Sequence, residues 1–452
     1  MAIDYKLRQE KQGGFLLDRR KGTALDLSQS RFDLLVALRT ASRPPPDWPD
    51  AGIAHHFGAD TIAGWEWWQT LKEMELTTET GLESLQIITL GDDPENVPDD
   101  CLAAPTRVYF ELTRRCNLSC RTCFNDSHQP LAGELTVPEI LDTLDQLDRL
   151  GTFEIRFTGG EPTAHPGFRE IVAFARERGF YVSLGTNGVY SDQVRSWIYE
   201  SGVDWFIVSL DGTEEVNDRV RGRGTYRQVL RTLAELAAHS QLAVRLNMVV
   251  ARHNFHTLES VAQLADQYGV ESLNMIPLRP YGRSVKAMTD DMFDQSDFYM
   301  FVKQIQGLRR RYQVQFPTTL DLLDPEATTS HDPMVQKKHT CAAGVEATVI
   351  GATGDVYGCS YSPASFPDSP DVEGRRLFVA GNVREESLRD IWRDSPRWAV
   401  FRYLDVYKNP HCQTCPHYGV RCVGSCPIMG YSQEGRPDAL DPYCFVDLVK
   451  GA

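Results

Sequence analysis

The sequence lacks long apolar runs and any excess of positive charge. No hydrophobic stretch approaches the ~18 residues that a membrane span requires, and Met1 to Arg20 is polar and mixed in charge, where a secreted protein would carry an apolar signal. The formal net charge of −15 disfavours nucleic acid or an anionic membrane as a partner. We therefore expect a cytoplasmic protein that binds neither.

Internal repeats and low-complexity tracts are also lacking, and 452 residues are enough for two or three domains with a large core. Cysteine, by contrast, is plentiful. Eleven cysteines in a chain without a secretion signal indicate metal or redox chemistry and argue against a disulfide scaffold.

The middle of the chain, from Thr106 to about Ile276, alternates apolar strands with helical patterns. This alternation predicts repeated βα units and a parallel sheet or barrel. The first helix has a capping-box start at Thr136 to Glu139. The predicted strands are Val108–Leu112, Phe153–Phe157, Tyr181–Leu184, Trp205–Leu210, Ala243–Val250 and Ser272–Ile276.

The first hundred residues have a different pattern. Gly14 to Asp26 predicts a hairpin, and Ser28 to Leu38 and Ile62 to Met74 predict helices on either side of a proline break. Gly91 to Pro98 reads as a polar linker. The last ~110 residues show little periodicity and are not expected to build much core from side chains alone, so we expect bound metal to hold them together.

Three cysteines, Cys116, Cys120 and Cys123, follow the first predicted strand as Cys-x3-Cys-x2-Cys. Three thiolates can hold three irons of a four-iron cluster and leave the fourth iron open to a small molecule. A zinc site would need a fourth nearby ligand, for which His128 is the local candidate. The spacing resembles the signature of the radical S-adenosylmethionine (radical SAM) enzymes, in which the open iron chelates SAM.

Three further polar loops follow the next three strands, where parallel βα folds place their ligand sites. Gly159, Gly160 and Glu161 resemble the family's GGE element, which contacts the amino group of SAM. Asn187 and Ser209 would belong to the ribose- and methionine-binding set, with ordinary turn or cap roles as the alternative. Arg221 lies in a family-like Asp-x-x-Arg-Gly element and would pair with a carboxylate, with a surface ion pair as the alternative.

The chain departs from the family at one position of the cysteine loop. The residue before the third cysteine is commonly aromatic and packs near the adenine, but here it is Thr122, and Phe124 follows Cys123. This leaves the adenine contact open and does not affect the cluster.

Seven carboxyl-terminal cysteines resemble the SPASM extension of radical SAM proteins, which holds two auxiliary four-iron clusters. The resemblance assigns Cys412, Cys415, Cys422 and Cys444 to an outer cluster. It assigns Cys341, Cys359 and Cys426 to an inner one, which would then have an open iron or a non-cysteine ligand. Six residues, not the usual five, separate Cys415 from Cys422. Two zinc knuckles are the alternative, and Cys101 is expected to be a packed thiol.

The segment that begins Gly-Gly-Phe-Leu-Leu-Asp resembles the winged-helix peptide-recognition domain of enzymes that modify ribosomally made peptides. In that domain an edge strand pairs with a leader peptide. A merely structural extension is the alternative.

Together these features predict an α/β protein with three parts. Residues 1–98 would form the winged-helix-like domain, 105–320 a partial (β/α)6 radical SAM barrel, and 335–452 the SPASM domain. The cofactors would be SAM and three [4Fe-4S] clusters, with a flavodoxin- or ferredoxin-type reductant as an electron-donating partner.

The resemblance implies that SAM is cleaved reductively to a 5′-deoxyadenosyl radical, which takes hydrogen from a precursor peptide to install a cross-link or related change. A sulfatase-type maturase or a tetrapyrrole or cofactor biosynthesis enzyme is the alternative, as is a non-catalytic electron carrier. No general base stands out among Asp211, Tyr281 and Arg283. The segment from Leu273 to Arg283 reads as a strand exit that could also reach SAM or substrate.

Overall fold

The computed structural model describes most of the 452 residues. The described ranges are 3–41, 48–89, 100–279, 281–284, 288–317, 341–362, 372–402, 409–416, 418 and 424–444. The predicted linker at Gly91 to Pro98 lies outside them, as does Cys422.

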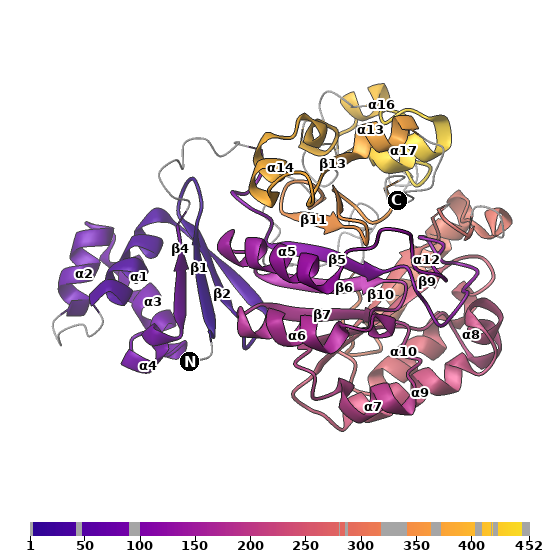
Figure 1. Ribbon diagram of the computed structural model, residues 1–452, viewed down its shortest axis with the longest axis horizontal. Helices are drawn as coiled ribbons and strands as arrows, with labels where there is room; N and C mark the ends of the chain where they lie inside the picture. The colour runs from indigo at the N-terminus through magenta and orange to yellow at the C-terminus, as the bar shows by residue number, and fades with distance from the viewer. Residues whose placement is uncertain are drawn as a thin grey trace.

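The amino-terminal region is a four-stranded sheet covered by helices, at the left of Figure 1. The strand order is β3-β2-β1-β4, so β3 is an edge strand. The predicted hairpin and both predicted helices are confirmed. The elements are β1 (Tyr5–Gln9), β2 (Gly14–Asp18), β3 (Thr23–Leu27), α1 (Gln29–Ala41), α2 (Trp48–Phe57), α3 (Thr61–Glu73), α4 (Glu79–Glu83) and β4 (Leu85–Ile88).

Six parallel strands, in the order β10-β9-β8-β7-β6-β5, form the open barrel predicted from the alternation. All six predicted strands are confirmed to within about two residues. The strands are β5 (Arg107–Thr113), β6 (Glu154–Gly159), β7 (Tyr181–Thr186), β8 (Trp205–Ser209), β9 (Ala243–Val250) and β10 (Ser272–Pro277). The helices are α5 (Val137–Arg149), α6 (Phe168–Glu177), α7 (Asp192–Ile198), α8 (Glu214–Arg221), α9 (Thr225–Ala237), α10 (Leu258–Gln267) and α12 (Gln295–Arg309).

The carboxyl-terminal region continues the barrel sheet, because β11 pairs in parallel with β5. Its elements are β11 (Ala347–Ile350), β12 (Asp355–Tyr357), α13 (Val372–Phe378), β13 (Val379–Asn382), α14 (Leu388–Asp394), α15 (Ala399–Arg402), α16 (Pro410–Gln413) and α17 (Pro427–Glu434). Ile350, Ile391 and Trp398 are buried in the same core as the barrel strands. The expectation that this region could bury little core was wrong for residues 347–362 and 372–402, where side chains from many short elements share one core.

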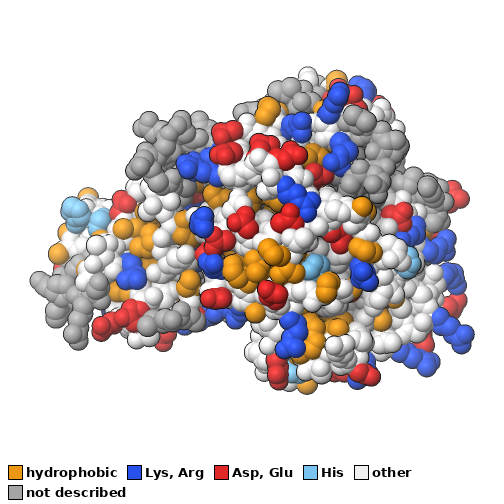
Figure 2. Space-filling view, viewed as in Figure 1, with side chains coloured by type: hydrophobic (Ala, Val, Ile, Leu, Met, Phe, Trp, Pro, Cys, Tyr) orange, Lys and Arg blue, Asp and Glu red, His pale blue; other side chains and the backbone are white. Residues whose placement is uncertain are grey.

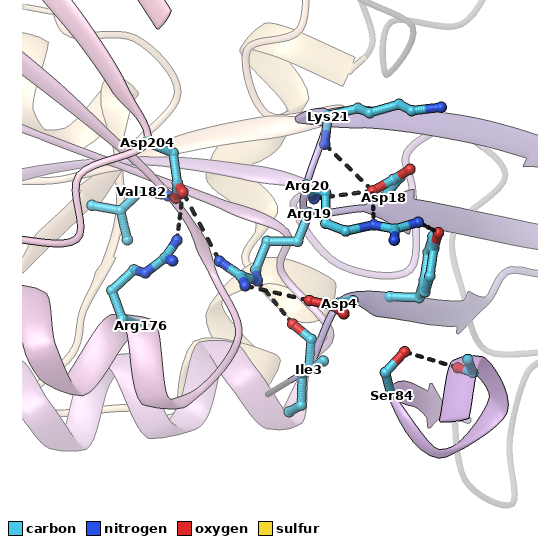
Figure 3. Close-up of polar contacts among 12 residues, drawn as sticks. Ile3, Asp4, Asp18, Arg19, Arg20, Lys21, Ser84, Arg176, Val182 and Asp204 are labelled. Atoms are coloured by element: carbon cyan, nitrogen blue, oxygen red, sulfur yellow. Dashed lines mark hydrogen bonds and ion pairs between the residues drawn. The ribbon is translucent and has the colours of Figure 1, made fainter. Parts of the chain in front are cut away.

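The amino-terminal sheet docks against the amino-terminal ends of the barrel strands. Buried Lys6 pairs with Asp148 at 2.7 Å, and Arg8 donates to the carbonyl oxygen of Gly151. Figure 3 shows Arg19 reaching Asp204, just before β8, while Arg176 binds the same carboxylate. Because cations of one region meet acceptors of the other, the two regions form a specific contact.

The outer surface carries charges of both signs. On the face shown in Figure 2, the acidic and basic side chains of the described residues are interspersed. Among the described residues, no helix is long and apolar enough to cross a membrane.

Candidate active site

The four predicted loops meet at the carboxyl ends of the barrel strands. Asn187, after β7, donates from Nδ2 to the Oδ1 of Asn117 at 2.7 Å and lies 3.8 Å from the Sγ of Cys116. Asn117 in turn donates to the carbonyl oxygen of Val189. The loop after β7 is therefore tied directly to the cysteine loop after β5.

Glu161 connects the second and third loops. Its buried carboxylate accepts hydrogen bonds from the Thr186 hydroxyl at 3.0 Å and from the Asn187 backbone N–H at 2.8 Å, and also from Thr163. Burial raises the pKa of this carboxyl, and these donors oppose the rise. The contacts give Glu161 a positioning role for the loop that carries Asn187, and its contact with an ammonium group stays a prediction.

Gly159 and Gly160 let the second loop lie against the cysteine loop. Gly159 has a φ of +134°, which L side chains rarely adopt. A Cβ on Gly160 would lie 2.2 Å from the carbonyl oxygen of Arg115. Asn125 adds a 3.1 Å bond to the Gly159 carbonyl oxygen. Both glycines are thus required by the close approach of two backbones.

The end of helix α8 joins the fourth loop to the cysteine loop, because Arg221 binds Asp211 of the fourth loop and Val220 binds the cysteine loop. The Nε of Arg221 donates to the fully buried Asp211 at 2.8 Å, and although burial opposes it, this carboxylate raises the pKa of Arg221. The backbone N–H of Arg121 donates to the Val220 carbonyl oxygen. The predicted alternative of a surface ion pair is wrong, because the pair is buried. The half-buried Ser209 makes no side-chain hydrogen bond with any described residue.

Arg283 fastens the cysteine loop from the exit of β10. It donates to the carbonyl oxygens of Cys120 at 2.7 Å and Ser127 at 2.9 Å, and pairs with Asp126. Tyr281 donates to the Ile428 carbonyl oxygen at 2.6 Å. These two residues and Asp211 have structural partners, so none of them stands out as a general base.

The surroundings of the cysteine triplet fit an iron–sulfur cluster. The Sγ atoms of Cys116 and Cys123 each accept a backbone N–H at 3.4 Å, from Leu118 and Ser127, and such bonds favour sulfur that carries negative charge. Burial raises the pKa of Cys116 to about 12, so its thiolate requires a bound cation. No three Cys, His, Asp or Glu side chains in the described ranges converge on a point that could hold a single metal ion. Cluster ligands bind separate irons and need no such convergence.

The structure gathers the three cysteines assigned to the inner auxiliary cluster. Cys341, Cys359 and Cys426 come from separate segments, yet the thiols of Cys359 and Cys426 both interact electrostatically with that of Cys341. Each of the three also interacts with Arg279. Their mutual proximity fits one shared cluster.

Part of the outer set is also brought together. The Sγ of Cys412 lies 3.6 Å from the Ser425 hydroxyl, which accepts the backbone N–H of Asp441 in the loop that carries Cys444. The Cys415 backbone donates to the Cys412 carbonyl oxygen. Cys422 lies outside the described residues. Cys101, as expected, packs against the core.

The sequence did not predict the contacts of Tyr361, which join the cysteine loop of the barrel to the carboxyl-terminal region. Phe124 packs on Tyr361 with ring centroids 5.2 Å apart, so the aromatic residue after Cys123 faces the carboxyl-terminal region. The Arg279 guanidinium lies 4.7 Å from the centre of the same Tyr361 ring. Tyr361 is far from both partners in the chain, so no local pattern indicates the contact.

Comparisons with known proteins agree with this geometry. The radical SAM superfamily model matches residues 110–265, and the SPASM iron–sulfur cluster-binding domain model matches residues 341–416. The chain is 31% identical over 347 residues to the mycofactocin maturase MftC of Mycobacterium ulcerans, covering 76% of this chain and 88% of that protein. It is 27% identical over 356 residues to the PqqA peptide cyclase of Methylorubrum extorquens, covering 78% and 88%.

The solved structure of SuiB from Streptococcus suis bound to S-adenosylmethionine has a similar fold. The TM-score is 0.69 at 17% identity, with 97% of this chain and 98% of SuiB covered. A second SuiB structure, bound to its precursor peptide SuiA, matches with the same TM-score at 16% identity and covers 98% of each chain. The family models and the mycofactocin maturase together place this chain among the radical SAM enzymes with a SPASM domain, which use SAM and [4Fe-4S] clusters.

Proposed function

We propose that this enzyme modifies a ribosomally made precursor peptide, installing a cross-link or a related side-chain change. The observation that carries the proposal is the amino-terminal domain, whose sheet ends in the edge strand β3 and which is fixed to the barrel by the buried Lys6–Asp148 ion pair and the hydrogen bond from Arg8 to Gly151. An edge strand offers unpaired N–H and C=O groups to an extended peptide. An enzyme that modifies a sulfatase-type protein or a small tetrapyrrole would not need an edge strand that binds an extended peptide.

The proposed domains are 1–98, 105–320 and 335–452. In the barrel, Cys116, Cys120 and Cys123 would hold the first cluster, and Gly159, Gly160, Glu161, Asn187, Ser209 and Arg221 would shape the SAM site. The inner and outer auxiliary clusters would take the two cysteine sets given above. With these groups bound, the chemistry supplied is hydrogen abstraction by a 5′-deoxyadenosyl radical from an unreactive carbon.

The chain's own residues position this chemistry. Asn117 and Asn187 hold two loops together beside Cys116, while Arg283 fixes the loop that carries Cys120 and Cys123. Similarity to MftC, to the PqqA peptide cyclase and to SuiB, whose structure contains a precursor peptide, supports a peptide substrate. A flavodoxin- or ferredoxin-type protein is the proposed electron donor.

The first test is anaerobic reconstitution with iron and sulfide, followed by a SAM-cleavage assay with dithionite. We expect about twelve irons per chain, as three four-iron clusters require, and 5′-deoxyadenosine that disappears when Cys116, Cys120 and Cys123 are all replaced by alanine. Wild-type protein that leaves SAM intact would contradict the proposal.

The peptide substrate is tested by co-expression with small peptides encoded beside the gene, followed by mass spectrometry. Leu25, a half-exposed residue on β3, is replaced by aspartate, and Met300 on α12 serves as an exposed apolar control. We expect L25D to reduce peptide modification and leave peptide-free SAM cleavage intact, while M300D changes neither. Equal peptide modification in L25D would remove β3 from the peptide site.

A further inference from the structure

Arg279 lies between the two cysteine regions at the exit of β10. Its guanidinium stacks 4.7 Å from the centre of the Tyr361 ring, and Tyr361 stands two residues after Cys359. Tyr361 also contacts Tyr281, with ring centroids 6.1 Å apart. The arginine head is therefore held on an aromatic platform beside the inner cysteine set.

The charge of Arg279 has no close acidic partner. Within the described residues, no carboxylate lies within ion-pair distance of its guanidinium, and no side-chain hydrogen bond from it is found. Asp441 interacts with it over a longer range, but the Oδ1 of Asp441 accepts the Tyr443 backbone N–H at 2.8 Å. The groups that interact electrostatically with Arg279 are Tyr361, Asp441, two further tyrosines and the thiols of the inner cysteine set: Tyr281, Tyr443, Cys341, Cys359 and Cys426.

Two other arginines of the site have the polar partners expected of an arginine with a structural role. Arg221 pairs with a buried carboxylate, and Arg283 binds two carbonyl oxygens and Asp126. Among the residues that the structure describes, Arg279 has neither kind of partner, although it is half-buried. A half-buried cation without a counter-charge at ion-pair distance is costly, so an anionic group beside Arg279 would stabilise it.

We propose that Arg279 is the counter-charge of the inner auxiliary cluster and raises the reduction potential of that cluster. One-electron reduction adds one negative charge beside the guanidinium, so a nearby fixed cation stabilises the reduced form more than the oxidised form. The inference rests on the proposed inner ligand set. Arg279 would not bind iron itself, and its charge, more than its packing, would set the reduction potential of the inner cluster.

The experiment is an anaerobic redox titration followed by electron paramagnetic resonance, with iron content measured on the same samples. Wild type, R279Q and R279K are compared, with R227Q as a control that removes the same charge from an exposed position on α9. All four proteins, including the one with Arg279 and Arg227 unchanged, carry alanine in place of Cys116, Cys120 and Cys123. Only the auxiliary clusters then contribute to the paramagnetic resonance signal. A C426A variant identifies the inner signal.

We expect R279Q to lower the ratio of reduced to oxidised inner cluster about tenfold at a fixed solution potential, equal to a 59 mV shift for a one-electron couple. R279K and R227Q should stay near wild type, and the outer cluster should be unaffected in every variant. An unchanged inner potential in R279Q overturns the proposal, as does an equal shift in R279K, which keeps the charge.

Loss of the inner cluster from R279Q is resolved by R279K. If R279K then keeps the iron content of wild type, the positive charge is required to hold the cluster. If R279K loses as much iron as R279Q, the proposal is overturned. Failure of the ligand set itself has a separate signature, because C426A would then retain all of its iron.

Discussion

Arg384 holds Glu139 with two guanidinium nitrogens, at 2.6 Å from Nε to Oε1 and 2.9 Å from Nη2 to Oε2. Arg384 follows β13, and Glu139 belongs to the first turn of α5, so the pair joins the SPASM region to the barrel. Glu139 also accepts the Thr136 backbone N–H as part of the predicted capping box. The Glu139 carboxylate therefore both caps the start of α5 and binds the SPASM region to the barrel.

This pair predicts a specific pH dependence of stability. The side-chain bonds from Arg384, followed by those from Thr136, lower the pKa of Glu139 from 4.5 to about 2. A lowered folded-state pKa contributes stability that is fully present above about 4.5 and is lost as the pH falls towards 2. Because the pair is partly exposed, we expect E139Q to cost only about 0.5–1 kcal/mol at pH 6.

The measurement is urea denaturation of wild type and E139Q at several pH values. The difference in free energy of unfolding should shrink between pH 5 and pH 3. A difference that is constant over this range would show that the charge of Glu139 does not contribute.

Gly160 should be intolerant of any side chain. G160A would place a Cβ 2.2 Å from the Arg115 carbonyl oxygen and push the second loop away from the cysteine loop. We expect about four irons fewer per chain and at least about tenfold slower SAM cleavage. The control is G185A in β7, where the nearest atom to a new Cβ is 3.6 Å away. Iron content and 5′-deoxyadenosine formation check both variants, and equal behaviour would contradict the proposed role of the close approach.

The inner auxiliary site is tested by single cysteine replacements. We expect C426A to lose about four irons, because it removes one of the three cysteines that lie near one another there. C101A should keep full iron content, since Cys101 packs against the core and is assigned to no ligand set. The measurement is the iron and sulfide content per chain of both reconstituted variants. Full iron content in C426A would remove this residue from the ligand set.

The contact between the amino-terminal domain and the barrel should respond unequally to its two charges. D148N leaves the fully buried Lys6 without its counter-charge, which costs about 3 kcal/mol. K6M replaces the cation with an apolar side chain against Phe180 and should cost less. Urea denaturation of both variants provides the measurement, and a larger loss in K6M would show that the ion pair itself is strongly stabilising.

The sequence predicted the barrel well because its signals are local. Each strand from Val108 to Ile276 is a short apolar run that a polar loop ends, and those loops carry the site residues. The strand β1 was missed because buried Lys6 and Arg8 make it look like a polar segment. Their burial depends on Asp148, Glu10 and the Gly151 carbonyl oxygen, of which two are far along the chain.

The carboxyl-terminal strands were missed for a related reason. The four-residue strand β11 owes its place to parallel pairing with β5, more than two hundred residues earlier. Arg279 was noted only as part of a strand exit, since its platform Tyr361 follows much later in the sequence. The resemblance to the SPASM extension assigned the cysteines to two sets, which stay predictions, but the position of Arg279 beside the inner set depends on tertiary contacts.

The docking of the amino-terminal sheet has a consequence for the precursor peptide. The sheet meets the barrel where β6 to β8 begin, whereas the four site loops follow the ends of these strands. The six-residue strand β6 spans about 20 Å at ~3.3 Å per residue. Under the proposed function, a leader held at β3 and a residue modified at the loops must be separated by at least about six extended residues. Shortening the spacer of the precursor below that length should stop modification while the leader still binds.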